Sequence, residues 1–403
     1  MITPVLRRTF AIAAGLLASL AGAGEITELP SPAGPGAMGS SLTRGPDGTV
    51  HLSWLEPAAG ESHALKFARF DAAARHWSEA QTIATGPGWF VNWADFPQLA
   101  VQGDRMTAVW FEDNPATPDH GGHHGSGYHA RTSASTDGGK TWGTSRAVSA
   151  ESRAVEFVAL QPLPNGRLLA AWLDGRAGEA GMQLWSRVLG DGNAAPDTLV
   201  DPLVCDCCQL AFTALPDGGA LLAYRGRSQE EVRDMKVARF RGDRWEPPRP
   251  LPADGWKIAA CPVNGPRLAQ TGGSTAAVWF TGADGKSRVN LATSADAGQS
   301  FGKPVRLDLG RPQGRVDAAA LPDGTAVLTW LEMSGADGTP GGIQMRTLSP
   351  AGKLSAPVML APTQTTRATG FPRLVWLEGK KLLLSYTEAG EPGRVRTLLV
   401  TLD

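Results

Sequence analysis

Three of the four cysteines in this chain lie within four residues, Cys205, Cys207 and Cys208, and the fourth, Cys261, follows downstream. Free thiols are reactive and bind metals, and a cluster this tight is therefore unusual as simple core packing. Thiolates select soft ions, and Cu(I) accepts two or three sulfur ligands without requiring a full tetrahedron. The spacing therefore predicts a soft-metal site at the four cysteines, with copper as the expected ion and zinc as the alternative.

Two other interpretations of the thiols remain open. A disulfide from Cys205 or Cys208 to Cys261 would staple two segments of the fold, and the even number of cysteines favours it. The leftover pair would then form a vicinal bridge or a very small ring, and both are strained. The other interpretation is one disulfide with two remaining thiolates, or a thiol–disulfide redox exchange.

A glycine-rich segment, residues 113–128, carries His120, His123 and His124, with His129 just beyond it. Imidazole is a good ligand for copper and zinc, so these histidines are candidate additional ligands. A loop of this composition is equally typical of a surface insertion that binds nothing.

The N-terminus has the features of an export signal. Arg7 and Arg8 precede an apolar run, residues 10–20, that is too short to span a bilayer, and Ala21-Gly22-Ala23 is typical of a cleavage site. We expect residues 1–23 to be a signal peptide, with a periplasmic or secreted mature chain that does not span a membrane. The paired arginines also resemble a twin-arginine signal.

The full 403-residue chain contains 38 basic and 39 acidic residues, and no basic patch typical of nucleic-acid binding is visible. Short apolar strands ending in Trp or Tyr recur about every 55 residues, each after a tight turn such as Pro-Asp-Gly. These strands are residues 50–56, 106–112, 168–174, 221–226, 275–281, 326–332 and 382–388.

Repeats of this size predict an all-β fold for residues 24–403, a seven-bladed β-propeller of four-stranded antiparallel blades. The last repeat, residues 371–402, supplies only three strands. We therefore expect the N-terminal strand, residues 25–30, to complete the seventh blade and remove an exposed sheet edge. A closed ring of this kind is expected to be a monomer.

Two turns carry an S-x-D-x-G-x-T/S-W/F signature. Its residues are Ser135, Asp137, Gly139, Trp142, Ser294, Asp296, Gly298 and Phe301. The chain thus resembles the Asp-box (BNR repeat), sialidase-like β-propellers over essentially its whole mature length. The resemblance implies that each Asp bonds nearby backbone amides while the aromatic side chain packs into its blade.

The resemblance also raises sialidase activity, which in such proteins uses an arginine triad, a Tyr–Glu nucleophile pair and an Asp acid/base. The F/Y-R-I-P motif of those enzymes is not recognisable here. Among the three tyrosines, Tyr224 and Tyr386 occupy core positions of the repeat, which leaves Tyr128. A glycan hydrolase is therefore kept as the enzyme alternative.

The block from Asp201 to Pro266, which contains all four cysteines, is similar to a group of exported bacterial sialidase-like proteins to which no activity can be attached. Propeller geometry places the cysteine cluster before blade four and Cys261 before blade five, on one rim. Arg225, Arg227 and Trp256 are expected on the same rim as ligand-facing residues.

From these features we predict an exported propeller whose role is to bind a soft transition metal or to transfer it, with a metal-donor or metal-acceptor protein as partner. The alternatives are a sialidase-like hydrolase and an interaction scaffold with structural disulfides.

Overall fold

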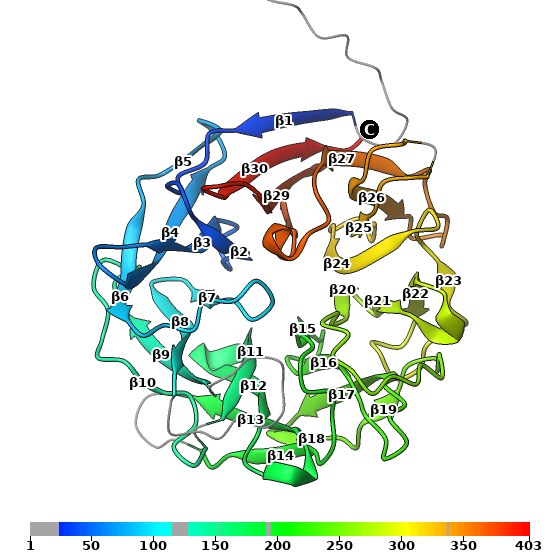
Figure 1. Ribbon diagram of the computed structural model, residues 1–403, viewed down its shortest axis with the longest axis horizontal. Coiled ribbons are helices and arrows are strands. Elements are labelled where there is room, and N and C mark those ends of the chain that lie inside the picture. Colours follow the sequence, from blue (N-terminus) through cyan, green and yellow to red (C-terminus); the bar gives the residue numbers. More distant parts are fainter. Residues whose placement is uncertain (1–23, 115–127, 153, 191–194, 337) are drawn as a thin grey trace, which may run out of the picture.

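The computed structural model describes residues 24–403 except 115–127, 153, 191–194 and 337. Seven antiparallel sheets follow one another around a central axis, as Figure 1 shows. This arrangement confirms the predicted seven-bladed propeller, and no α-helix occurs in the described part of the chain. The predicted signal peptide lies outside the described residues and stays a prediction.

Each blade begins with its innermost strand and ends with its outermost one. Blade one contains β2 (Met38–Arg44), β3 (Val50–Pro57), β4 (Ser62–Asp71), β5 (His76–Trp77) and β6 (Gln81–Pro87). Blade two contains β7 (Gln98–Gln102), β8 (Arg105–Asp113), β9 (Tyr128–Ser135) and β10 (Arg146–Ala147), and blade three contains β11 (Val155–Pro162), β12 (Leu168–Asp174), β13 (Gln183–Leu189) and β14 (Thr198–Asp201). Blade four contains β15 (Ala211–Ala214), β16 (Ala220–Arg225), β17 (Met235–Arg241), β18 (Arg244–Trp245) and β19 (Arg249–Pro250).

Blades five to seven contain the strands β20 (Arg267–Thr271), β21 (Ser274–Thr281), β22 (Arg288–Ser294) and β23 (Val305–Arg306); β24 (Pro312–Ala320), β25 (Ala326–Glu332), β26 (Gly342–Leu348) and β27 (Val358–Pro362); and β28 (Arg373–Glu378), β29 (Lys381–Glu388), β30 (Arg394–Thr401) and β1 (Glu25–Leu29). Four short 3-10 turns lie between strands: η1 (Pro164–Gly166), η2 (Gly178–Ala180), η3 (Ala283–Gly285) and η4 (Arg367–Thr369).

Two blades depart slightly from the predicted four strands. In blade one β5 and β6 both pair with β4, and in blade four β18 and β19 both pair with β17. The outermost position of each of these blades is therefore shared by two short strands.

The N-terminal strand closes the ring as predicted. β1 pairs antiparallel with β30, with Ile26 opposite Val400 and Leu29 opposite Thr397. Arg396 adds a 2.8 Å ion pair to Glu28 across the same two strands. The outer edge of β30 is thus covered, which protects it from pairing with another chain.

The repeated tryptophans form the core between blades. Trp54, Trp172, Trp279 and Trp330 are completely buried. Three of them donate their indole N–H to an acid two residues later: Trp54 to Glu56 at 2.8 Å, Trp172 to Asp174 at 2.7 Å and Trp330 to Glu332 at 2.6 Å. The acid that follows the aromatic residue in the repeat therefore satisfies a donor that burial would otherwise leave unpaired.

The two signature turns join the third and fourth strands of blades two and five, on the rim opposite the cysteines. Asp137 accepts hydrogen bonds from the Thr141 backbone N–H at 2.9 Å and hydroxyl at 2.6 Å, and Asp296 does the same with Ser300. Gly139 has a φ of 83°, and a Cβ there would lie 2.5 Å from the Phe67 ring. The turn thus requires glycine for both conformation and space.

Among the described residues, no helix has the length and apolar character needed to cross a bilayer.

Candidate metal centre

The cysteine cluster lies in the segment that crosses from the outermost strand of blade three, β14, to the innermost strand of blade four, β15. Its first residues are held by the end of β16: Val204 bridges Gly226, and the Cys205 N–H donates to the Arg225 carbonyl at 3.0 Å. The backbone that carries the thiols is therefore anchored to a blade.

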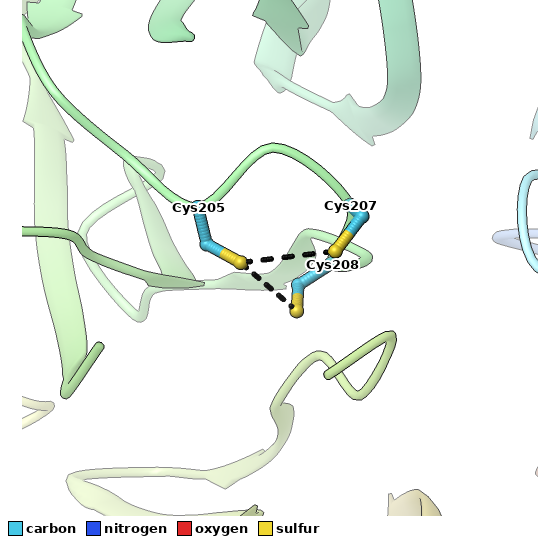
Figure 2. Close-up of side chains that lie close together, drawn as sticks. All are labelled: Cys205, Cys207 and Cys208. Carbon is cyan, nitrogen blue, oxygen red and sulfur yellow. Dashed lines mark hydrogen bonds between the residues drawn. The ribbon is translucent and has the colours of Figure 1, made fainter. Parts of the chain in front are cut away.

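The three clustered thiols converge on one point. Figure 2 shows the side chains of Cys205, Cys207 and Cys208 turned toward one another. The Sγ of Cys205 lies 4.0 Å from that of Cys207 and 3.5 Å from that of Cys208, and all three sulfurs lie within 4.8 Å of one another. All three residues are only 1 % exposed, and none is disulfide-bonded.

These separations suit a shared ion. Sulfur atoms bound about 2.3 Å from one metal lie about 3.8 to 4.0 Å from each other, in either trigonal or tetrahedral geometry. The thiols are thus already spaced as ligands of one metal would be.

Cys261 lies in the segment between β19 and β20, the equivalent position before blade five. It packs against the same hydrophobic cluster as the three thiols, and its side chain interacts with Cys207. It is partly exposed and stands outside the tight group of three. The four predicted ligands therefore come together as three buried thiols with a more exposed neighbour.

A guanidinium lies directly against the cluster. Arg233 Nη1 is 3.3 Å from Cys205 Sγ and 2.9 Å from Asp206 Oδ1, and Arg233 Nη2 donates to Glu231 at 2.9 Å. The Arg233 residue is only 3 % exposed. A buried cation in hydrogen-bond range of a sulfur favours the thiolate form of that sulfur.

Arg225 is the second cation near the thiols, and the structure buries it rather than exposing it on the rim. Its guanidinium donates to the carbonyls of Arg233, Asn264 and Phe280 at 2.8 to 2.9 Å and lies over the Trp256 ring. Its hydrogen bonds thus tie blade four to blade five, while its charge acts on the neighbouring cysteines.

The other two rim candidates differ in exposure. Arg227 is partly exposed and is paired with Glu231. Trp256 is 8 % exposed and packs edge-on against Phe280. Neither residue touches the sulfurs directly in the contacts of the described chain, so both are neighbours of the centre.

The three thiols differ in acidity. Burial raises the pKa of Cys205 to about 11 and raises the pKa of Cys207 well above its usual value. Burial also acts to raise the pKa of Cys208, but hydrogen bonds from Cys205 and Cys207 and the charge of Arg225 outweigh it. The pKa of Cys208 is therefore lowered well below its usual value, which makes Cys208 the most acidic of the three thiols.

His120, His123 and His124 lie outside the described residues, so their predicted contribution stays a prediction. His129 is the second residue of β9, and its Nε2 lies 3.9 Å from Oε2 of Glu112.

A second polar group on this rim was not found by the sequence analysis. The buried Tyr128 hydroxyl donates to Asp95 at 2.7 Å, and Asp95 also accepts the Phe157 N–H at 2.8 Å. Glu156 interacts with the same phenol. Burial raises the pKa of Asp95 to about 7, and burial together with the charge of Asp95 raises the pKa of Glu156 to about 8. Tyr128 was a sequence candidate, but nothing in the repeat pattern marks the two acids.

No protein-family model matches this sequence, and no curated protein is similar to it. Solved structures share its fold at low identity. A protein of unknown function from Dyadobacter fermentans is 14 % identical, with a TM-score of 0.56 over 94 % of this chain and 99 % of the other. The polysaccharide lyase Uly1 is 10 % identical, with a TM-score of 0.54 over 91 % and 90 % of the two chains. An ulvan lyase is 10 % identical, with a TM-score of 0.52 over 92 % and 95 %. These similarities establish the propeller fold.

Proposed function

We propose that this protein binds a soft transition metal, with Cu(I) as the preferred ion, through Cys205, Cys207 and Cys208. The observation that supports the proposal most directly is the convergence of three buried, unbridged sulfurs within 4.8 Å. Thiolates are the protein ligands that select Cu(I), and three of them complete a trigonal site.

Two buried guanidiniums lie near the thiols, and one of them, Arg233, is also paired with Asp206 and Glu231. Three thiolates and Cu(I) carry two net negative charges, and the nearest cations are the buried guanidiniums of Arg225 and Arg233. Buried charges are tolerated only when they are paired or coordinated, and the two arginines offset part of the negative charge of a thiolate–Cu(I) centre in this interior. Zn(II) prefers a fourth ligand, which would have to be Cys261 or an added group.

The proposed role is metal binding and transfer in an exported protein. Cys261 is partly exposed beside the buried thiols, so a metal arriving from a donor protein would meet it before the enclosed centre. Ligand exchange between proteins proceeds through shared coordination, which a semi-exposed thiol permits and a fully buried one does not.

The decisive experiment is a competition titration with a chromogenic Cu(I) chelator on reduced, purified protein. Wild type is expected to remove one Cu(I) per chain from the chelator. Cys207→Ser should keep its fold and lose most of that affinity, because a hydroxyl is a poor soft-metal ligand. A matched Ser228→Ala variant, which changes a nearby loop hydroxyl, should bind as wild type does. Equal affinity of the Cys207→Ser and wild-type proteins would contradict the proposal.

A glycan-acting enzyme is the second candidate, supported by the Asp95–Tyr128–Glu156 group on the same rim. A phenol held between two carboxyls of raised pKa is an arrangement that can move protons or activate a nucleophile. The test is release of a fluorogenic leaving group from a sialoside. Our metal-binding account expects no release, whereas release that is abolished in Tyr128→Phe would favour the enzyme.

A further inference from the structure

A polar cavity lies on the axis of the propeller, apart from the cysteines. Its volume is about 270 Å³, and all seven innermost strands contribute to its wall. Near the ends of three of those strands, the wall carries Arg267 from β20, Asp317 from β24 and Arg373 from β28. The cavity is therefore a feature of the closed ring as a whole.

The charges that face this cavity do not balance. Arg267 Nε lies 3.3 Å from Asp317 Oδ1, and Arg373 Nε lies 3.8 Å from Asp317 Oδ2. Asp317 Oδ2 also accepts the Leu374 backbone N–H at 2.7 Å. One carboxylate is thus shared between two guanidiniums and a backbone donor, and Arg44 adds a third guanidinium to the cavity wall, so positive charge is in excess.

Arg267 Nη1 donates to the carbonyls of Leu210 at 3.1 Å and Pro266 at 3.4 Å, but each arginine also keeps a donor without a hydrogen bond. Arg267 is only 7 % exposed, and its Nε is buried without a hydrogen bond. Arg373 Nε and Nη1 are both buried without a hydrogen-bond partner. Buried polar groups are normally hydrogen-bonded, and an orphaned one calls for an unseen ion or water.

Two other buried arginines near the channel are held by backbone carbonyls. Arg315, on the same strand as Asp317, donates to the carbonyls of Thr366 and Gly370. Arg225 donates to three carbonyls. Asp95 lines a small adjoining cavity with Arg267 and Arg373, but its carboxyl is bonded to Tyr128 and Phe157, and among the described residues it forms no ion pair with either arginine.

We propose that Arg267 and Arg373 form a binding site for a small oxyanion, such as inorganic phosphate or sulfate, in the central channel. An oxyanion supplies both things the site lacks: hydrogen-bond acceptors for the orphaned N–H groups and a negative charge for the excess cation. Guanidinium groups match the oxygens of such anions in geometry and bind them through charge-assisted hydrogen bonds. Water would satisfy the donors but would leave the charge uncompensated.

The test is calorimetric titration of the full chain with phosphate and, separately, with sulfate, in a low-chloride buffer. Wild type should show saturable one-site binding and a higher melting temperature with either anion than with sodium chloride at equal ionic strength. Arg373→Gln should weaken binding about 10- to 100-fold, which is the effect on affinity of losing one hydrogen bond to a charged group. Arg373→Lys, which keeps the charge but not the planar donor pair, should fall between the two.

Arg167→Gln is the matched control, because it makes the same charge change at an exposed arginine paired with Asp243. It should bind as wild type does. Asp317→Asn removes the carboxylate that competes for both guanidiniums and should tighten binding, which keeps the proposal testable if Arg373→Gln folds poorly. No saturable heat with either anion in wild type, or unchanged affinity in both Arg373→Gln and Asp317→Asn, would overturn the site.

Discussion

Arg233 and Cys205 are in direct contact: the Nη1 of the guanidinium lies 3.3 Å from the Sγ of the thiol, in the interior of the protein. Arg233 comes from the loop after β16, whereas Cys205 comes from the segment before β15. Asp206 and Glu231 hold the guanidinium in place on its other side. The contact places a fixed positive charge next to a residue that must lose a proton to bind a metal.

Removing this charge should weaken metal binding in a pH-dependent way. Arg233→Gln raises the pKa of the neighbouring thiols, because their thiolate form loses its cation. The loss of Cu(I) affinity should be about tenfold or more from pH 6 to pH 9, where Cys205 and Cys207 stay protonated because their pKa values are raised, and it should shrink only as the pH approaches about 11, where Cys205 ionises. Chelator competition across this pH range is the measurement.

Arg227→Gln is the control for Arg233, since it removes a guanidinium that pairs with Glu231 and does not reach the sulfurs. Arg233→Lys should restore part of the affinity by restoring the charge. Unchanged affinity in Arg233→Gln, or an affinity in Arg233→Lys as low as in Arg233→Gln, would contradict charge stabilisation.

Metal binding should release protons, and their number follows from the three pKa shifts. Cys205 and Cys207 have raised pKa values and are protonated near neutral pH, whereas the pKa of Cys208 is lowered. Because Cys208 is the most acidic of the three ligands, fewer than three protons should leave per Cu(I) bound near pH 7.5. Calorimetry in buffers of different ionisation enthalpy gives this number. Release of three protons would show that Cys208 is not ionised beforehand.

Cys261 should affect the rate of metal exchange more than the affinity. It is partly exposed and borders Cys207 without belonging to the tight group of three. In Cys261→Ser we expect Cu(I) uptake and removal to slow several-fold while the equilibrium affinity changes less than in Cys207→Ser. Stopped-flow transfer to a chelator separates the two effects. An affinity loss as large as that of Cys207→Ser would instead make Cys261 a full ligand.

A change in the core between blades should lower the stability of the fold without changing metal binding. Trp172→Phe removes the indole N–H that Asp174 accepts at 2.7 Å in a completely buried position. The variant should lose about 1 to 3 kcal/mol of unfolding free energy, the contribution of a buried hydrogen bond to a carboxylate, and should keep its Cu(I) affinity, because Ser152 and Arg176 still hold Asp174. Trp185→Phe, on the more exposed third strand, is the control and should lose less. Denaturant unfolding and chelator competition on the same samples provide the comparison.

The fold could be predicted from the sequence because its determinants are local and repeated. A Trp or Tyr at the end of each second strand, an acid two residues after several of them, and turns such as Pro-Asp-Gly recur in register. The missing fourth strand of the last repeat then leaves the N-terminal strand as its partner, as the pairing of Ile26 with Val400 confirms.

The candidate site was only partly predictable, because much of it depends on contacts distant in sequence. The adjacency of three cysteines is visible in the chain, and their position before blade four follows from the repeats. The contact of Arg233 with Cys205 and the orphaned donors of Arg373 depend on side-chain directions that no repeat encodes. Arg225 was expected on the exposed rim, but the carbonyls of Asn264 and Phe280 draw it into the interior.

The central claim, that these thiols hold a metal, is tested most directly by counting reactive thiols. Protein purified under native, anaerobic conditions is alkylated with and without a strong Cu(I) chelator, and its mass is then measured by mass spectrometry. Our account predicts that Cys205, Cys207 and Cys208 resist alkylation until the chelator is added. It also predicts that the chelator removes one copper ion per chain. Absence of reactive thiols in both conditions, as disulfides would give, would contradict it.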